Sequence, residues 1–202
     1  MSRSDNPTCT AFQGATRIAN GDLTWVALAA KEALESDSTA NVLIFDDRTS
    51  RVIDVDFRGT RDDVLQHVTG RNLKEEAARN PDDPVRRPGR PRLGVVPREV
   101  TLLPRHWDWL NEQPGGASVT LRRLVEDARR ASDGKDRLRV AQDAAYRFMS
   151  AMAGDHPGFE EATRALFASD LERFQQHTVN WPVDVRDHAY RLAAPAFRQD
   201  AA

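Results

Sequence analysis

Residues 8–70 carry apolar residues at strand-like and helix-like spacings that predict a small α+β lobe. Five elements are expected in the order strand, helix, strand, strand, helix, over residues 10–19, 22–33, 42–45, 52–57 and 60–68. Over residues 52–57, Val52, Asp54 and Asp56 alternate with apolar neighbours, which is typical of a strand with one exposed face. We expect this lobe to fold independently, because its elements can cover one small core.

Residues 71–93 have a different composition. They are rich in charge, contain four prolines and offer almost nothing large to bury. This composition predicts a linker.

The central segment, residues 94–131, predicts one short strand and two helices. The β-favouring run at residues 100–103 ends at Pro104, which suits the first turn of a helix. Pro114-Gly115-Gly116 should end that helix. Ser118 is then expected to cap a second helix with an apolar stripe that contains Leu121, Leu124, Val125 and Ala128.

Residues 132–194 predict a helical region, and residues 195–202 a tail. Ser132-Asp133-Gly134 should break the chain before a long helix over residues 135–153. Its apolar seam is expected to pack against the following helices or against a second chain. His156, His177 and His188 are interpreted as surface or capping residues, since no two of them have metal-site spacing.

Charge and composition narrow the class of protein and the partners that we expect. The net charge is −2, but residues 84–130 contain ten arginines and no lysine against five acidic residues, a local charge of +5. No apolar run is long enough to cross a bilayer, and residues 1–8 lack the apolar core of a secretory signal. We therefore expect a cytoplasmic protein with no membrane partner and with a basic centre that suits nucleic acid or an acidic protein.

The sequence offers few candidate residues for metal binding or catalysis. Asp46, Asp47, Asp54 and Asp56 could bind a hard cation, but turn and strand-face roles explain all four aspartates. Cys9 is the single cysteine and is expected to be a small buried residue. We expect no cofactor, no metal and no enzymatic activity.

The central segment resembles the ribbon-helix-helix DNA-binding fold in its order of strand, helix, glycine-containing turn and serine-capped helix. That resemblance implies a homodimer whose paired strands enter the major groove, with Thr101 among the residues that face the groove. It also implies that the start of the second helix holds a phosphate. A helix N-terminus favours an anion at the backbone N–H groups of Val119 and Thr120.

Arg86-Arg87-Pro88-Gly89-Arg90-Pro91-Arg92 resembles the AT-hook, a peptide that binds the minor groove of A·T-rich DNA. Only Gly89-Arg90-Pro91 is in register with that motif. Arginines seek the negative potential of a narrow minor groove, and glycine lets the backbone approach its floor.

The whole chain is also similar to the bacterial family called domain of unknown function 2239. The phrases that carry this similarity are CTAF, GRPRLGVVPREVTLLPRHWDWLNEQPGGAS, AYRFMSAMAGDHPGFEEATRALFASD and WPVDVRDHA. The family implies no catalytic residues.

Two functions follow from these patterns. The first is a DNA-binding protein, a candidate transcriptional regulator, with double-stranded DNA as its partner. Its expected contacts are Arg86, Arg87, Arg90, Arg92, Arg98, Thr101, Arg105, Ser118, Thr120, Arg122 and Arg123. The second is a non-catalytic adaptor for an acidic protein, with Trp107, Trp109 and Trp181 as interface anchors.

Overall fold

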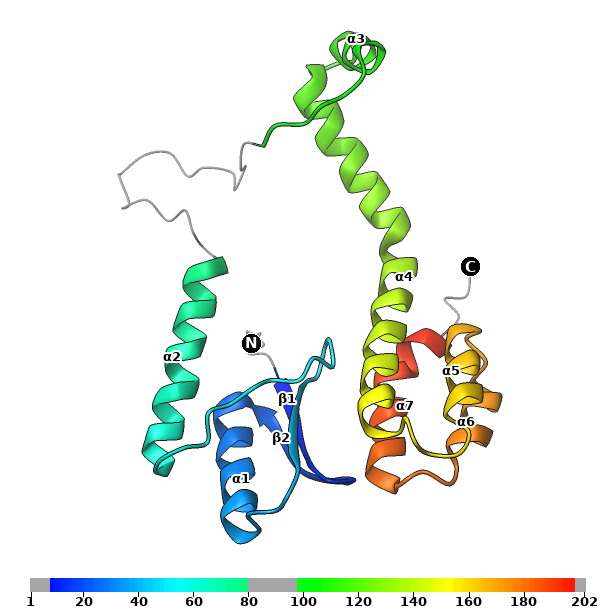
Figure 1. Ribbon diagram of the computed structural model, residues 1–202. Helices are drawn as coiled ribbons and strands as arrows, with labels where there is room; N and C mark the ends of the chain where they lie inside the picture. The colour runs from blue at the N-terminus through cyan, green and yellow to red at the C-terminus, as the bar shows by residue number, and fades with distance from the viewer. Residues whose placement is uncertain (1–7, 80–97, 199–202) are drawn as a thin grey trace, which may run out of the picture. The chain divides into compact units, whose positions relative to one another are not determined.

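The computed structural model describes residues 8–79 and 98–198 (Figure 1). The chain divides into two compact units. The main unit comprises Met1–Arg79 and Lys135–Ala202, and the central unit comprises Asn80–Gly134. One sheet and seven helices make up the described residues, which confirms the predicted α+β class.

The sheet of the main unit has three antiparallel strands in the order β2-β1-β3. Strands β1 (Thr8–Gln13) and β2 (Thr16–Asp22) form a tight hairpin, and β3 (Val42–Asp46) pairs with the other edge of β1. Gly14 turns this hairpin at a φ of 55°, a conformation that glycine adopts readily. The expected single strand over residues 10–19 is therefore two strands.

Successive residues of β1 point to opposite faces of the sheet. Both faces are buried at this strand, each by different helices. Cys9 and Ala11 pack with Val26 of α1 (Leu23–Ser36). Phe12, on the opposite face, packs with Phe148 and the other apolar residues of the C-terminal helices. The sheet is thus the middle layer of the main unit.

The C-terminal part of the main unit is helical, as predicted. The C-terminal half of α4 (Gly116–Met152) is followed by α5 (Phe159–Phe167), α6 (Leu171–Thr178) and α7 (Val183–Phe197). Helix α7 continues through Pro195 to Phe197, whose ring packs against Phe174. The tail expected from residue 195 therefore begins later, because this contact holds the last turn.

The predicted independence of residues 8–70 differs from the structure. Phe12 and Phe45 of the sheet share one core with Phe148, Leu166 and Val185. A lobe of residues 8–70 alone would expose both of these rings to water. The N-terminal and C-terminal segments therefore share one core within one compact unit.

Two other predicted elements of the N-terminal segment differ from the structure. Residues 52–57 form only an isolated bridge between Val52 and Phe45 instead of a full strand. Helix α2 (Arg61–Arg79) extends beyond the expected linker boundary at residue 71. Residues 71–79 are rich in leucine, lysine, glutamate, alanine and arginine, which are strong helix formers.

Helix α4 is continuous through Ser132-Asp133-Gly134, where we expected a break. A single glycine costs a helix only about 1 kcal/mol relative to alanine. Ion pairs between residues one turn apart lie before and after this glycine. Arg129 and Arg130 are bonded to Glu126, and Arg139 is bonded to Asp136. Each such pair supports the helix modestly.

Candidate functional site

A helical hairpin forms the described part of the central unit. Helix α3 (Pro104–Glu112) has its proline in the first turn, as predicted, and ends before Pro114. Gly115 and Gly116 then adopt φ values of 86° and 71°, which reverse the chain into α4. Leu110 and Thr120 are the two buried residues of residues 98–134. The hairpin thus encloses a very small core of its own.

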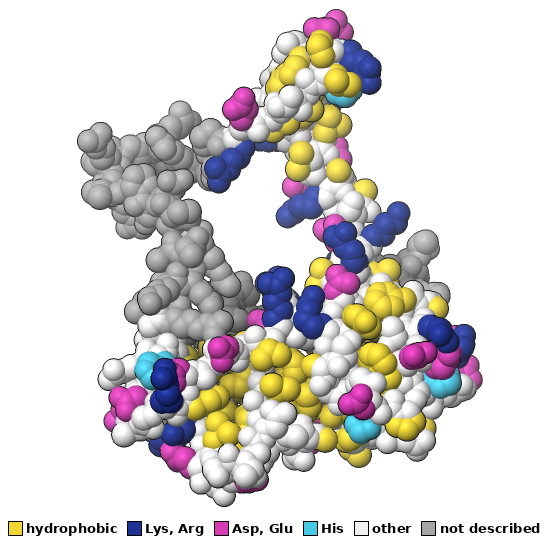
Figure 2. All heavy atoms as spheres, viewed as in Figure 1, with side chains coloured by type: hydrophobic (Ala, Val, Ile, Leu, Met, Phe, Trp, Pro, Cys, Tyr) yellow, Lys and Arg dark blue, Asp and Glu magenta, His cyan; other side chains and the backbone are white. Residues whose placement is uncertain are grey.

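Most of the predicted DNA contacts that lie on this hairpin are exposed. Arg86, Arg87, Arg90 and Arg92 lie outside the described residues. The side chains that are exposed to solvent are those of Arg98, Thr101, Arg105, Ser118, Arg122 and Arg123. Figure 2 shows basic and hydrophobic side chains interspersed along this segment. These groups are accessible to a macromolecular partner.

Two details of the predicted phosphate site are wrong. Thr120 is buried, so its hydroxyl is not available to a phosphate. Ser118 is the third residue of α4 and not its cap. A helix that begins at Gly116 leaves the N–H groups of its first turn, those of Ala117 and Ser118 among them, outside its own ladder. These groups take the place of the predicted donors, the N–H groups of Val119 and Thr120, which lie within the ladder. Arg122 lies one turn further on and donates from Nε to the Ser118 carbonyl oxygen at 3.1 Å.

The predicted strand at residues 100–103 is also not formed within this chain. Residues 98–103 have irregular backbone, although Leu103 has the extended angles φ −65° and ψ 148°. A lone strand leaves its N–H and C=O groups unpaired. In the part of the central unit that the structure describes, no other segment offers an edge for it to pair with.

The charge of the hairpin is balanced. Residues 98–134 contain six arginines and six acidic residues. Glu126 is bonded to both Arg129 and Arg130, at 3.1 and 3.4 Å. The positive excess of the centre therefore lies mainly in the arginines of residues 86–92.

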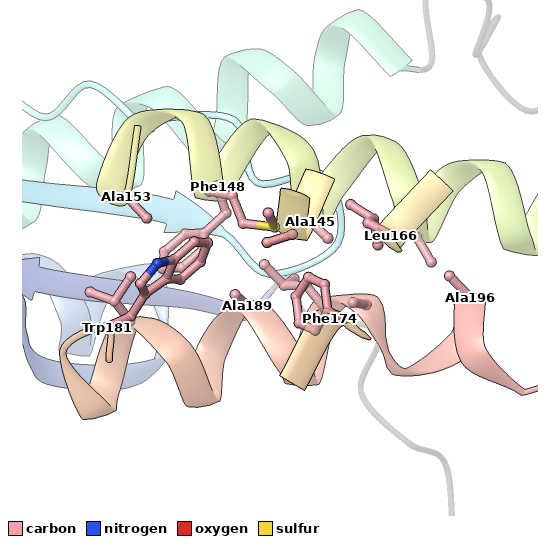
Figure 3. Packing of buried hydrophobic residues seen from close by; sticks show 14 of the residues in the cluster. Ala145, Phe148, Ala153, Leu166, Phe174, Trp181, Ala189 and Ala196 are labelled. Carbon is pink, nitrogen blue, oxygen red and sulfur yellow. The ribbon is translucent and has the colours of Figure 1, made fainter. Parts of the chain in front are cut away.

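The three tryptophans expected as interface anchors differ in exposure. Trp181 is 3% exposed and lies among the core residues of Figure 3, where its Nε1 donates to the Pro157 carbonyl at 3.0 Å. It anchors the main unit and is not available to a partner. Trp107 is half-buried, whereas Trp109 is 47% exposed.

A polar network that sequence reasoning missed joins the sheet to α7. Thr10 is fully buried, and its Oγ1 donates to Asp47 Oδ1 at 2.5 Å. Asn20 donates to Thr10 Oγ1 at 2.8 Å and to Asp47 Oδ2 at 3.0 Å. Arg191 donates to Thr10 Oγ1 at 3.2 Å, to Asp47 at 3.4 Å and to His188 Nδ1 at 2.9 Å. No sequence motif signals this network, because its members are separated by up to 181 residues.

His188 lies at the inner end of this network and was wrongly interpreted as a surface or capping residue. Its ring is buried between Phe12 and Phe148, with centroid distances of 5.3 and 4.4 Å. Burial, and next the charge of Arg191, lower the pKa of His188 to about 4. The network therefore holds a neutral imidazole. Its role is structural, because it connects the sheet to α7.

Comparison with known proteins places the chain in a family. The sequence pattern of one family, described as uncharacterized proteins conserved in bacteria (DUF2239), matches residues 8–193. The chain belongs to this family. The resemblance expected from the sequence is thereby confirmed. No curated protein and no solved structure matches the chain.

The matched span of this DUF2239 protein includes the helical hairpin and the polar network. None of the helices in residues 8–79 and 98–198 is long and apolar enough to cross a membrane.

The acidic cluster of this DUF2239 protein has structural partners. Asp46 Oδ1 accepts from the N–H and Oγ1 of Thr49 at 2.7 and 2.6 Å. Asp47 belongs to the polar network, and Asp56 is bonded to Arg58 at 2.6 Å, which holds the pKa of Asp56 well below its usual range. Within the described residues, no three His, Cys, Asp or Glu side chains are grouped to hold a metal ion.

Cys9 of this DUF2239 protein is buried, as predicted. Its thiol donates to the Gly21 carbonyl at 3.5 Å. Burial, and next the negative charge of Asp47, raise the pKa of Cys9 to about 12. A thiol with such a pKa is a poor nucleophile at neutral pH, so Cys9 serves as a small core residue.

Proposed function

We propose that this DUF2239 protein binds double-stranded DNA as a homodimer and acts as a transcriptional regulator in the cytoplasm, without catalytic activity. The observation that carries the proposal is the exposure of Arg105, Arg122 and Arg123 on the helical hairpin, which follows the arginine-rich residues 86–92 in sequence. Phosphate contacts from arginine supply most of the sequence-independent affinity of DNA-binding proteins.

The start of α4 supports the phosphate part of the proposal. The positive end of a helix dipole and the N–H groups of its first turn favour an anion. The side chain of Ser118 is exposed beside these groups. Arg122 is held one turn away by its hydrogen bond to the Ser118 carbonyl. A phosphate at this position would meet both backbone donors and a guanidinium group.

Residues 98–103 and 86–92 carry the groove-binding part. In the proposed dimer, residues 98–103 of two copies pair as a ribbon that faces the major groove, which would give each of these segments a partner strand. Residues 86–92 act as an AT-hook-like arm in the minor groove. Thr101 is exposed and free to face a base edge.

The test compares two variants that remove equal charge. In one, Arg86, Arg87, Arg90 and Arg92 are replaced by alanine. In the control, four exposed arginines of the main unit, Arg48, Arg58, Arg164 and Arg173, are replaced by alanine. Binding of a fluorescent duplex is measured by anisotropy at about 50 mM salt, where phosphate contacts are strong. The arm variant is expected to lose at least about 100-fold in affinity and the control less than about threefold. Equal losses in both variants would contradict a role for the arm.

The second candidate is the adaptor, which the 47% exposure of Trp109 favours. Exposed aromatic residues are frequent anchors of protein interfaces. Under this alternative, Trp109→Ala abolishes capture of an acidic partner protein, while the variant that lacks the arginines of residues 86–92 retains capture. Under the DNA-binding proposal, Trp109→Ala leaves duplex affinity within about threefold of the parent, because tryptophan carries none of the phosphate contacts.

A further inference from the structure

Helix α4 contains a long stretch that the other described residues leave uncovered. Between Thr120 and Ala141, both of which are buried, no residue of this described helix is buried. This stretch nevertheless carries large apolar side chains, with Leu124 at 41% and Val125 at 64% exposure. Most helical stability in proteins comes from packing of an apolar face, so an uncovered face of this kind calls for a partner.

This stretch, in which Leu121 is half-buried and Leu124 is exposed, continues the spacing of a face that is buried elsewhere on the same helix. In the main unit, Leu138, Ala145 and Met149 of α4 pack into the core. Steps of seven residues back from Ala145 lead through Leu138 and Ala131 to Leu124. The same steps back from Met149 lead through Gln142 and Lys135 to Ala128 and Leu121. A seven-residue repeat of this kind keeps one seam on one side of a helix pair.

The charges agree with a seam at Leu121, Leu124, Ala128 and Ala131. In this repeat, Arg122, Arg123, Glu126, Arg129 and Arg130 all occupy positions that point away from it. Val125 borders the seam on one side and Asp127 on the other. The apolar side of α4 therefore suits another helix, while its outer side carries the arginines that the DNA-binding proposal uses.

The order of large and small residues suits a second copy of the same helix as the partner. When two copies run antiparallel with their centres at residue 126, Leu121 faces Ala131 of the second copy, and Leu124 faces Ala128 of the second copy. By symmetry, each leucine then lies opposite an alanine. Alternation of large and small residues across facing positions lets two helices interdigitate closely.

We propose that the seam Leu121, Leu124, Ala128 and Ala131 joins two copies of this protein as an antiparallel helix pair. The inference deepens the proposed function, because it supplies the twofold assembly that the DNA-binding proposal requires. In this arrangement, the two copies of Val125 approach each other on one side of the pair. The two copies of Asp127 face each other on the opposite side and repel.

The first test measures mass in solution by sedimentation for the full chain and two matched variants. Leu124→Asp places a charge in the seam, whereas Val140→Asp places the same charge on an exposed, outward position of the same helix. The parent and Val140→Asp are expected to be dimers. Leu124→Asp is expected to weaken the dimer at least about 100-fold, because each buried carboxylate would lie unpaired. A monomeric parent, or a dimer that Leu124→Asp leaves intact, would overturn the proposal.

The second test reads the direction of the helices. Asp127→Asn removes a like-charge contact only in the antiparallel pair, since in a parallel pair Asp127 would face Ser132 of the second copy. The variant is therefore expected to tighten the dimer about threefold, with a smaller gain at high salt. Asp133→Asn, which changes an exposed outward residue of the same helix, is the control and leaves the dimer unchanged. No difference between the two variants would overturn the antiparallel register.

The two proposals fail in different ways. A dimer that depends on Leu124 but retards no duplex DNA would contradict the proposed function and leave the helix pair standing. A monomer that binds duplex DNA through residues 86–92 would contradict the helix pair and leave the DNA-binding activity standing. Circular dichroism of each variant separates loss of pairing from loss of folding.

Discussion

Arg191 donates a hydrogen bond from Nη2 to Nδ1 of His188 at 2.9 Å, across one turn of α7. A guanidinium group can only donate, so Nδ1 must be the acceptor and the proton of the neutral ring must be on Nε2. Nε2 is buried and has no hydrogen-bond partner among the described residues. A second proton on this ring would have to displace the Arg191 contact in a buried site.

The protein is therefore expected to lose stability as the pH falls from 6.5 to about 4. Burial and the charges of Arg191 and Arg17 lower the pKa of His188, and Asp47 opposes them. The unfolded chain takes up a proton below pH 6.5, whereas the folded chain resists it until about pH 4. The free energy of unfolding should fall by about 3 kcal/mol across this window.

Urea unfolding at a series of pH values checks this prediction. His188→Asn keeps an acceptor near Nδ1 and does not titrate, so its stability should depend much less on pH in the same window. A parent and variant with parallel pH profiles would refute the assignment to His188.

Thr10→Val should destabilise the main unit by about 1–3 kcal/mol, because it removes the hydrogen bonds that the buried Thr10 hydroxyl makes, two of them with charged side chains. The substitution keeps the shape of a side chain that bonds Asp47, Asn20 and Arg191. Thr16→Val, at an exposed position of β2, serves as the control and should stay within about 0.5 kcal/mol of the parent. Equal stabilities of the two variants in denaturant titrations would show that the network does not hold the sheet to α7.

Gly158→Ala should cost more than Gly14→Ala, although both glycines have positive φ. A Cβ at Gly158 would lie 2.5 Å from the His177 carbonyl oxygen, whereas a Cβ at Gly14 would meet nothing within 4 Å. The backbone strain alone costs about 1–2 kcal/mol at each site. Thermal unfolding should rank the Gly158 variant well below the Gly14 variant, and the reverse order would contradict the packing of α5 against the end of α6.

A fragment of residues 1–79 should not fold cooperatively on its own. Phe12 and Phe45 would lose their contacts with Phe148, at 5.3 and 5.1 Å, and would be exposed to water. Loss of one large core side chain already costs about 3–5 kcal/mol. Circular dichroism during urea titration should give no sigmoidal transition for the fragment. A sigmoidal transition would restore the independent lobe that the sequence suggested.

Local signals predicted the elements that depend on local chemistry. Pro104 and Pro114-Gly115-Gly116 set the limits of α3 correctly, and Asp22 caps α1 with a hydrogen bond from the Trp25 N–H at 3.1 Å. The break predicted at Gly134 is wrong, because the helix formers and ion pairs around this glycine outweigh its small intrinsic cost to helix stability.

Features that depend on distant residues could not be predicted. Asp47 and Arg191 are 144 residues apart, and neither belongs to a motif that would pair them. His188 is one of five histidines, and only the structure shows the aromatic rings that bury it. In the same way, the strand-like alternation over residues 52–57 could not reveal that only Val52 has a bridging partner.

The dependence of duplex affinity on salt tests the central claim most directly. If the arginines of residues 86–92 and of the helical hairpin neutralise about six phosphates, affinity should fall about 10³-fold between about 50 and 200 mM salt. The arm variant should show a shallower slope, reduced by about one for each lost phosphate contact. An absence of duplex binding by the parent protein at about 50 mM salt would contradict the account.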